Sequence, residues 1–284
     1  MAVKSGKLLA LLMLAVGAAP AAELNPQTVK VWNEYVASVR ARTEARARPT
    51  ACFLWVDENA DRLQRLHRGE IVVAPGGQTP LHIPGGLIHH WMGAVFIPDV
   101  TLAQVLETVQ DYDRYKDYYP SVIRSTLTSR IGQEDRFSTL ERHQALFSRI
   151  ALDADFGATY TNAGPKRGYT FSRSTRLQQI QNYGEAHQRE MEPGASKAYM
   201  WRLDTISRYE ERDGGVYLEL EAMALSRDIP VALRWLVEPF VRDAAAGAMA
   251  ASLKQTRQAV LERSKGPMRP VTAVPAGAAA LRAQ

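Results

Sequence analysis

The chain has 284 residues, of which 46% are hydrophobic and 23% charged, so it can bury a core and is neither a disordered nor a fibrous protein. Its 35 basic and 30 acidic residues leave a net charge of +5, and no window gathers the like charges of a nucleic-acid-binding arm. A single cysteine, Cys52, excludes an internal disulfide and a cysteine-rich metal site.

The first 22 residues have the pattern of a secretory signal peptide. Lys4 and Lys7 form the positive n-region, Leu8–Val16 is the apolar run, and Ala19–Ala21 supplies an A-x-A cleavage site. The apolar run is about half of the ~20 residues that a bilayer-spanning helix needs. We therefore expect cleavage and export, which gives a periplasmic or secreted protein.

Residues 23–83 predict an N-terminal extension of helices and short strands. Asn25 is a candidate N-cap with Pro26 at the first helical position, and apolar residues then recur at helical spacing until the arginine-rich stretch before Pro49. A second helix is expected around 58–68 and a short strand at 71–73. A loop rich in Gly and Pro (75–86) marks the predicted boundary with the next unit.

From Leu87 the pattern is that of an antiparallel sheet with two helices. It predicts a strand at 87–97, a helix at 101–115, and then six strands with period-two character at 122–131, 137–150, 152–162, 169–181, 199–210 and 216–225. The turns leave no room for crossover helices, so neighbouring strands should pair antiparallel. A long helix over 231–263 can cover one face of the sheet, and the Pro- and Ala-rich residues 265–284 predict a disordered tail.

Two groups of residues resemble a known family. Ala94–Pro98, the helix end Val109–Tyr115 and Tyr119–Val122 resemble the opening of START-like domains, the SRPBCC superfamily of polyketide cyclases/dehydrases and lipid-transport proteins. Asp228–Pro230 and Arg234–Val237 are similar to the beginning of their last helix. The likeness covers residues 84–264 and is greatest to exported bacterial members. It implies an α+β helix-grip fold, in which a curved antiparallel sheet wraps around a long C-terminal helix, with a hydrophobic cavity between them.

Candidate ligand-binding residues come from the apolar faces of the predicted strands. Strand 152–162 alternates cleanly, with Leu152, Ala154, Phe156, Ala158 and Tyr160 on one face. For each candidate, plain core packing is the competing interpretation. The candidates are Ile123, Leu127, Phe156, Tyr160, Phe171, Arg173, Trp201, Leu203 and Phe240.

Charged residues on these strands need partners. Arg173 is expected on the face that holds Phe171 and Leu177, where it meets solvent, a structural carboxylate or the anionic head group of a ligand. On the strand at 199–210, the period of two likewise places Trp201 and Leu203 on one face. Glu219 and Glu221 are expected on a solvated face, where cross-strand ion pairing explains them.

Motifs for metals, nucleotides and activated nucleophiles are absent. The adjacent His89 and His90 point to opposite faces of a strand, and His143 is isolated, so no chelating pair is formed. Neither a glycine-rich phosphate loop nor a G-x-S-x-G sequence occurs. We expect no metal and no cofactor, and we assign no catalytic residue. Four tyrosines at the end of the first helix line a cavity mouth or pack that helix on the sheet: Tyr112, Tyr115, Tyr118 and Tyr119.

Three functions stay open on the sequence. The favoured one is an exported binding protein for a lipid-like or polyketide-like molecule, with transient membrane contact and no nucleic-acid partner. The second is a cofactor-independent cyclase or hydratase whose acid or base is Arg173, His89, His90, His143 or a tyrosine. The third is a ligand-free envelope scaffold in which the N-terminal helices fill the groove, with Trp32 as the plug.

Overall fold

The computed structural model describes residues 24–48, 51–144, 149–195, 198–229 and 231–265. The predicted signal peptide, and the predicted tail after its first residue, therefore lie outside the described residues. None of the helices described is long and apolar enough to cross a membrane.

Ten strands of the described chain form one antiparallel sheet in the order β1-β3-β10-β9-β7-β6-β5-β4, with β2 paired to β3 and β8 to β7. The antiparallel pairing predicted from the short turns is confirmed, whereas β2 and β8 are too short to show in the periodicity. The strands are β1 Val72–Pro75, β2 Leu81–Ile83, β3 Gly86–Pro98, β4 Val122–Ile131, β5 Glu134–Gln144, β6 Arg149–Gly164, β7 Arg167–Gln181, β8 Arg189–Glu190, β9 Met200–Arg212 and β10 Gly215–Arg227.

The first helix begins where its predicted cap places it. The side chain of Asn25 accepts a hydrogen bond from the backbone N–H of Thr28 at 2.8 Å and so caps the first helix. The helix predicted over 101–115 ends earlier, because Asp111 leaves the helical conformation and a 3-10 turn follows. The helices are α2 Pro26–Arg46, α3 Ala60–His67, α4 Leu102–Val109, α5 Tyr115–Tyr118 and α6 Val231–Ser264, with 3-10 turns at Val56–Glu58 and Tyr112–Arg114.

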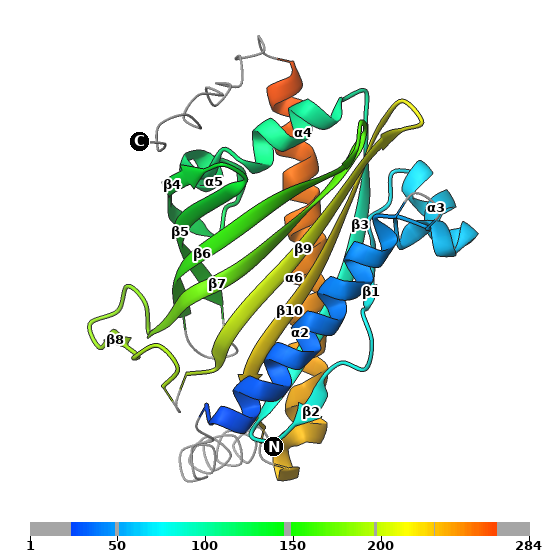
Figure 1. Ribbon diagram of the computed structural model, residues 1–284. Coiled ribbons are helices and arrows are strands. Elements are labelled where there is room, and N and C mark those ends of the chain that lie inside the picture. Colours follow the sequence, from blue (N-terminus) through cyan, green and yellow to red (C-terminus); the bar gives the residue numbers. More distant parts are fainter. Residues whose placement is uncertain (1–23, 49–50, 145–148, 196–197, 230, 266–284) are drawn as a thin grey trace, which may run out of the picture.

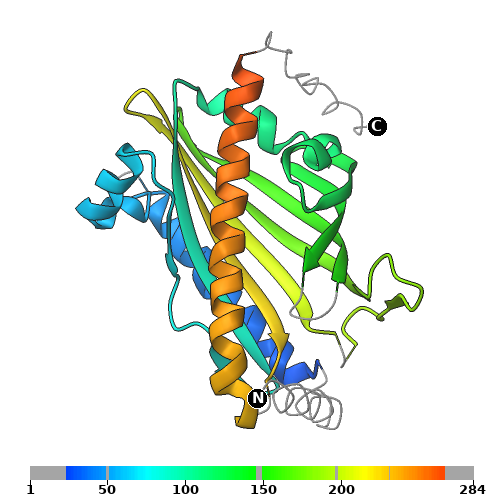
Figure 2. The same ribbon diagram turned by 180° about the vertical axis from the view of Figure 1, so that it is seen from behind.

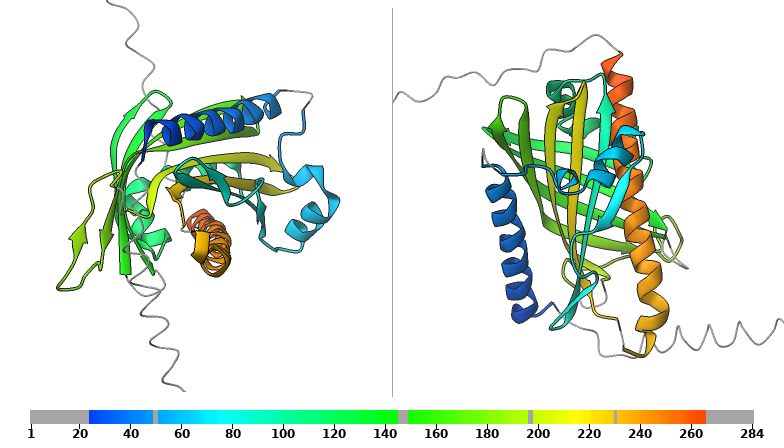
Figure 3. Two further views of the ribbon diagram at one scale, coloured as in Figure 1. Left: turned by 90° about the horizontal axis from the view of Figure 1, so that it is seen from below. Right: turned by 90° about the vertical axis from the view of Figure 1, so that its right-hand side faces the viewer.

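The sheet lies between two long helices. Figure 1 shows α2 in front of it, and Figure 2, from behind, shows α6 running along the other face. Seen from below, the sheet curves around α6 while α2 lies on the outer, convex face (Figure 3). This is the α+β helix-grip arrangement predicted from the sequence, with one further layer added by α2.

The convex face carries a core of its own under α2. Trp32, Val36 and Val39 of α2 pack with Trp201 of β9 and other buried side chains of the sheet. Trp32 is only 2% exposed, and burial of one such large apolar side chain stabilises the fold by about 1.5–3 kcal/mol. Trp32 therefore packs outside the groove, and the expectation that it plugs the groove is wrong.

The glutamates expected on a solvated face are buried beneath the same helix. Glu219 and Glu221 are 1% and 4% exposed. Arg208 donates from Nε to Glu219 at 2.9 Å and from Nη1 to Glu221 at 2.8 Å, and His90 Nε2 lies 2.8 Å from Glu221. Ion pairing was the right expectation for these residues. Solvation was not, because α2 covers the face.

Two β-bulges reverse the alternation of side chains in the sheet. Thr175 has no partner on β6, and Trp201 has none on β10, so each bulge inserts one residue into its strand. As a result, Phe171 and Arg173 lie on the convex face while Leu177 faces α6. The same effect separates Trp201 from Leu203. The shared faces expected for these residues are therefore wrong, because one extra residue shifts the period of two.

Candidate functional site

A cavity of about 640 Å³ lies between the concave face of the sheet and α6. Side chains from β3, β5, β6, β7, β9 and β10 line it on one side, and residues between Ala245 and Thr256 of α6 line it on the other. Val109, the tyrosines that follow α4, and Ser121 and Val122 at the start of β4 complete the wall. The volume falls in the range of roughly 300–1,000 Å³ that is typical of small-molecule sites.

Small side chains leave this space open. The predicted face of β6, from Leu152 through Ala154, Phe156 and Ala158 to Tyr160, lines the cavity in full. Opposite the sheet, α6 presents Ala245, Ala248 and Ala251. Within the sheet, β10 presents Ala222 and Ala224 to the same space. Alanine side chains are too short to bridge the gap between helix and sheet, so the groove stays unfilled.

Aromatic rings form one wall of the cavity. The ring of Tyr112 stacks on Phe137 at 4.2 Å between centroids, and Phe137 stacks on Phe156 at 5.1 Å. The hydroxyls of Tyr112 and Tyr160 lie 2.7 Å apart. Stacked rings of this kind offer apolar contact area in a fixed orientation.

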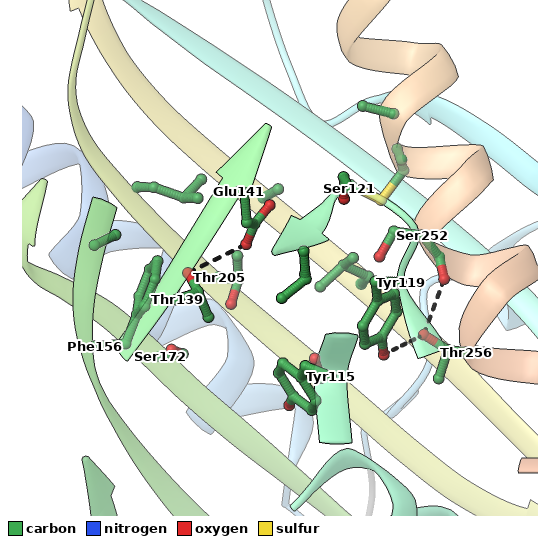
Figure 4. Close-up of a pocket in the computed structure, with 18 of the residues that line it drawn as sticks. Tyr115, Tyr119, Ser121, Thr139, Glu141, Phe156, Ser172, Thr205, Ser252 and Thr256 are labelled. Carbon is green, nitrogen blue, oxygen red and sulfur yellow. Dashed lines mark hydrogen bonds between the residues drawn. The ribbon is translucent and has the colours of Figure 1, made fainter. Parts of the chain in front are cut away.

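Tyr119 joins the segment after α5 to α6. Its hydroxyl donates to Thr256 Oγ1 at 2.9 Å, and the Thr256 hydroxyl donates to the Ser252 carbonyl at 2.9 Å (Figure 4). Tyr115 donates to the Val109 carbonyl at 2.6 Å. Both interpretations of the tyrosine cluster therefore apply to Tyr112, Tyr115 and Tyr119. These three side chains pack their segment against the rest of the fold and also line the cavity.

The cavity phenols remain protonated at neutral pH. Burial raises the pKa of Tyr119 to about 12 and the pKa values of Tyr112, Tyr115 and Tyr160 above their usual range. A protonated phenol donates a hydrogen bond and does not act as a base. These tyrosines therefore supply neutral polar groups.

Ionisable groups are few among the described lining residues. Apart from the tyrosines they comprise one carboxylate, Glu141, and two imidazoles, His89 and His143, with no lysine or arginine. Burial, followed by the charge of His82, lowers the pKa of His89 to about 4, so His89 is neutral at pH 7. Its Nε2 lies 2.9 Å from Ser226 Oγ.

Glu141 and His143 lie next to each other on the inner face of β5. Thr139 Oγ1 donates to Glu141 Oε1 at 3.3 Å, and His143 Nε2 lies 3.6 Å from Glu141 Oε2. Sequence reasoning named His143 but missed Glu141 and Thr139. The period of two places Glu141 and His143 on the same face as Phe137, and this could have indicated that they line the cavity. A polar run after an apolar residue, however, has the same pattern as the solvated end of a strand.

The structure places the nine candidate residues in three groups. Phe156, Tyr160 and Leu203 line the cavity. The side chain of Phe240 lies outside the described side chains. The other five lie away from the cavity lining: Ile123, Leu127, Phe171, Arg173 and Trp201.

Arg173 has a structural partner. Its Nε donates to Asp204 Oδ2 at 2.9 Å, and Asp204 is completely buried on the convex face. Of the groups considered for acid–base chemistry, Arg173 and His90 thus lie outside the cavity, whereas His89 and His143 line it. Of the four clustered tyrosines, Tyr112, Tyr115 and Tyr119 line the cavity and Tyr118 does not. The described residues contain no group of three or more His, Cys, Asp or Glu side chains that could hold a metal ion.

No protein-family model and no curated protein matches the chain. Among solved structures, a STAR-related lipid transfer protein fragment from Xanthomonas axonopodis is 16% identical with a TM-score of 0.42, covering 67% of this chain and 98% of its own. The Zhui aromatase/cyclase of a Streptomyces species is 11% identical with a TM-score of 0.43, covering 62% and 96%. Human STARD10 is 11% identical with a TM-score of 0.41, covering 74% and 81%. Similarity at this level extends to neither ligand nor activity.

The arrangement of the elements supports a statement about the fold. A curved antiparallel sheet, a short helical segment between its first and second long strands, and a long C-terminal helix across its concave face enclose one cavity. The chain has a START-like helix-grip fold.

Proposed function

We propose that this protein binds a hydrophobic or amphipathic small molecule, lipid-like or polyketide-like, between the sheet and α6. The observation that supports this most directly is the cavity of about 640 Å³ beneath α6, which lines it with three alanines among larger side chains. The proposal includes export to the periplasm or beyond. That part rests on the sequence of residues 1–22.

The chemistry of the lining favours an apolar ligand. Phe137 and Phe156 present ring surface to the cavity, and a ligand there regains dispersion contacts that an unfilled space lacks. Removal of apolar ligand surface from water contributes about 25 cal/mol per Å² before the costs of association are subtracted. The hydroxyls of Tyr112, Tyr115, Tyr119 and Tyr160 already have partners within the protein.

A matched pair of variants tests the site. Ser172 points into the cavity from β7 (Figure 4), and Thr159, exposed on the neighbouring strand, is paired with Phe171 and faces away. Ser172→Phe fills cavity volume, while Thr159→Phe adds the same side chain outside it. The proteins are purified under native conditions, extracted with organic solvent and analysed by mass spectrometry.

We expect a stoichiometric apolar compound in wild type and Thr159→Phe, and its loss from Ser172→Phe. Extracts without such a compound from all three proteins, together with no thermal stabilisation by added apolar compounds, would contradict the proposal.

A further inference from the structure

Glu141 is under-satisfied for a carboxylate inside a cavity. Its neighbours across the strands are Val122 on β4 and Leu152 on β6, both apolar. The hydroxyl of Thr139 gives it one long hydrogen bond, and the imidazole of His143 is beyond hydrogen-bond distance. A carboxylate has about four acceptor positions, so most of those of Glu141 are open to the cavity, into which it points (Figure 4).

The charge of Glu141 is not balanced by a nearby lysine or arginine. The described lining residues include neither, and His89 and the phenols are neutral at pH 7. Arg173 and Arg176 of β7 are engaged elsewhere, by Asp204 and by Asp153 with Asp155. Burial is the main cause of the high pKa of Tyr119, and the bond to Thr256 opposes it. The charges of Tyr209 and Glu141 raise this pKa further, which is consistent with Glu141 and Tyr119 lining the same cavity.

This electrostatic environment distinguishes between ligand head groups. A hydroxyl or ammonium group donates to Glu141 and satisfies acceptor positions that otherwise lack partners. A carboxylate or phosphate in the same place adds a second negative charge beside that of Glu141, which is unfavourable without a cation. The competing expectation, an anionic head group on Arg173, is incompatible with the position of that residue on the convex face.

We infer that Glu141 is the specificity-determining residue of the cavity and selects ligands whose polar group is an uncharged or cationic hydrogen-bond donor. This inference rests on the proposed function, that is, on the cavity binding an apolar skeleton at all. Hydroxyl and amine ligands share the donor chemistry, and the test separates them.

The test compares three ligands with one skeleton: dodecanol, dodecylamine and dodecanoate. Each displaces the neutral fluorophore N-phenyl-1-naphthylamine from wild type, Glu141→Gln and Glu134→Gln. Glu134 lies on the same strand but is exposed and paired with Arg136, so its substitution removes the same charge outside the cavity.

We expect wild type to bind the alcohol and the amine at least about tenfold more tightly than dodecanoate. In Glu141→Gln the affinity for dodecanoate should rise by about tenfold and that for the amine should fall by a similar factor, while Glu134→Gln behaves as wild type. If the fluorophore binds, but the three ligands have equal affinities and these affinities do not change in Glu141→Gln, the inference about Glu141 is overturned while the proposed function stands. Failure of the fluorophore and all three ligands to bind would overturn the proposed function together with it.

Discussion

Arg208 is an arginine with 1% of its side chain exposed, held between two buried glutamates. Removing such charges from water is expensive, so each must be paired and hydrogen-bonded. Glu219 also accepts from the backbone N–H of Val56, and Tyr35 Oη lies 2.7 Å from His90 Nδ1. Through these hydrogen bonds the charged cluster links α2 and the segment after it to the convex face of the sheet.

Glu221 should make the stability of the protein dependent on pH. Burial alone would raise its pKa, but hydrogen bonds and charges from His90 and Arg208 outweigh burial and lower the pKa from 4.5 to about 2. A lowered pKa in the folded state stabilises the protein above pH 4.5, and this contribution, about 3 kcal/mol, is lost as the pH falls toward 2. Denaturant unfolding should therefore show that the difference in the free energy of unfolding between wild type and Glu221→Gln becomes smaller between pH 5 and pH 2. A difference that stays constant over this range would be inconsistent with the pairing.

Arg173 is expected to act on stability and not on ligand binding. Arg173→Ala leaves the buried carboxylate of Asp204 without its donor, which should lower the free energy of unfolding by about 1–3 kcal/mol. Affinity for N-phenyl-1-naphthylamine should be unchanged. Arg136→Ala is the control, since its pair with Glu134 is exposed and contributes little. A loss of affinity in Arg173→Ala at unchanged stability would restore the ligand-binding role expected from the sequence.

At the scale of elements, α2 is a structural layer that lies opposite the cavity. Trp32→Ala removes a buried ring from the convex core and should cost about 3–5 kcal/mol, measured by denaturant unfolding. Asn33→Ala, on the exposed side of the same helix turn, should change stability by less than about 0.5 kcal/mol. Ligand affinity of folded Trp32→Ala should equal that of wild type. A large loss of affinity would show that α2 contributes to the site.

The strands illustrate what the sequence can and cannot predict. Between Leu152 and Tyr160, β6 has no bulge on its own side of the β6–β7 ladder, and its alternation correctly predicted every residue that this stretch contributes to the cavity. β7 and β9 contain one extra residue each, and the predicted faces of Phe171 and Trp201 were wrong for that reason. A bulge depends on pairing with the neighbouring strand, which periodicity within a single strand does not encode.

At the scale of the whole molecule, the fold was predictable and the burial of the convex face was not. The order of elements and the long last helix indicated a helix grip, and the structure has one. The sequence could not show that α2 crosses the outer face of the sheet, because its apolar residues would pack equally well on either face. Glu219 and Glu221 consequently appeared solvated, although they are buried.

The most direct test is a crystal structure of the protein soaked with 12-bromododecanol, with the bromine located by anomalous scattering. We predict one bromine peak between the sheet and α6, within contact distance of cavity side chains such as Phe156 and Leu203, and the hydroxyl near Glu141. A peak on the convex face beside α2, or a cavity without the compound at saturating concentration, would contradict binding between the sheet and α6.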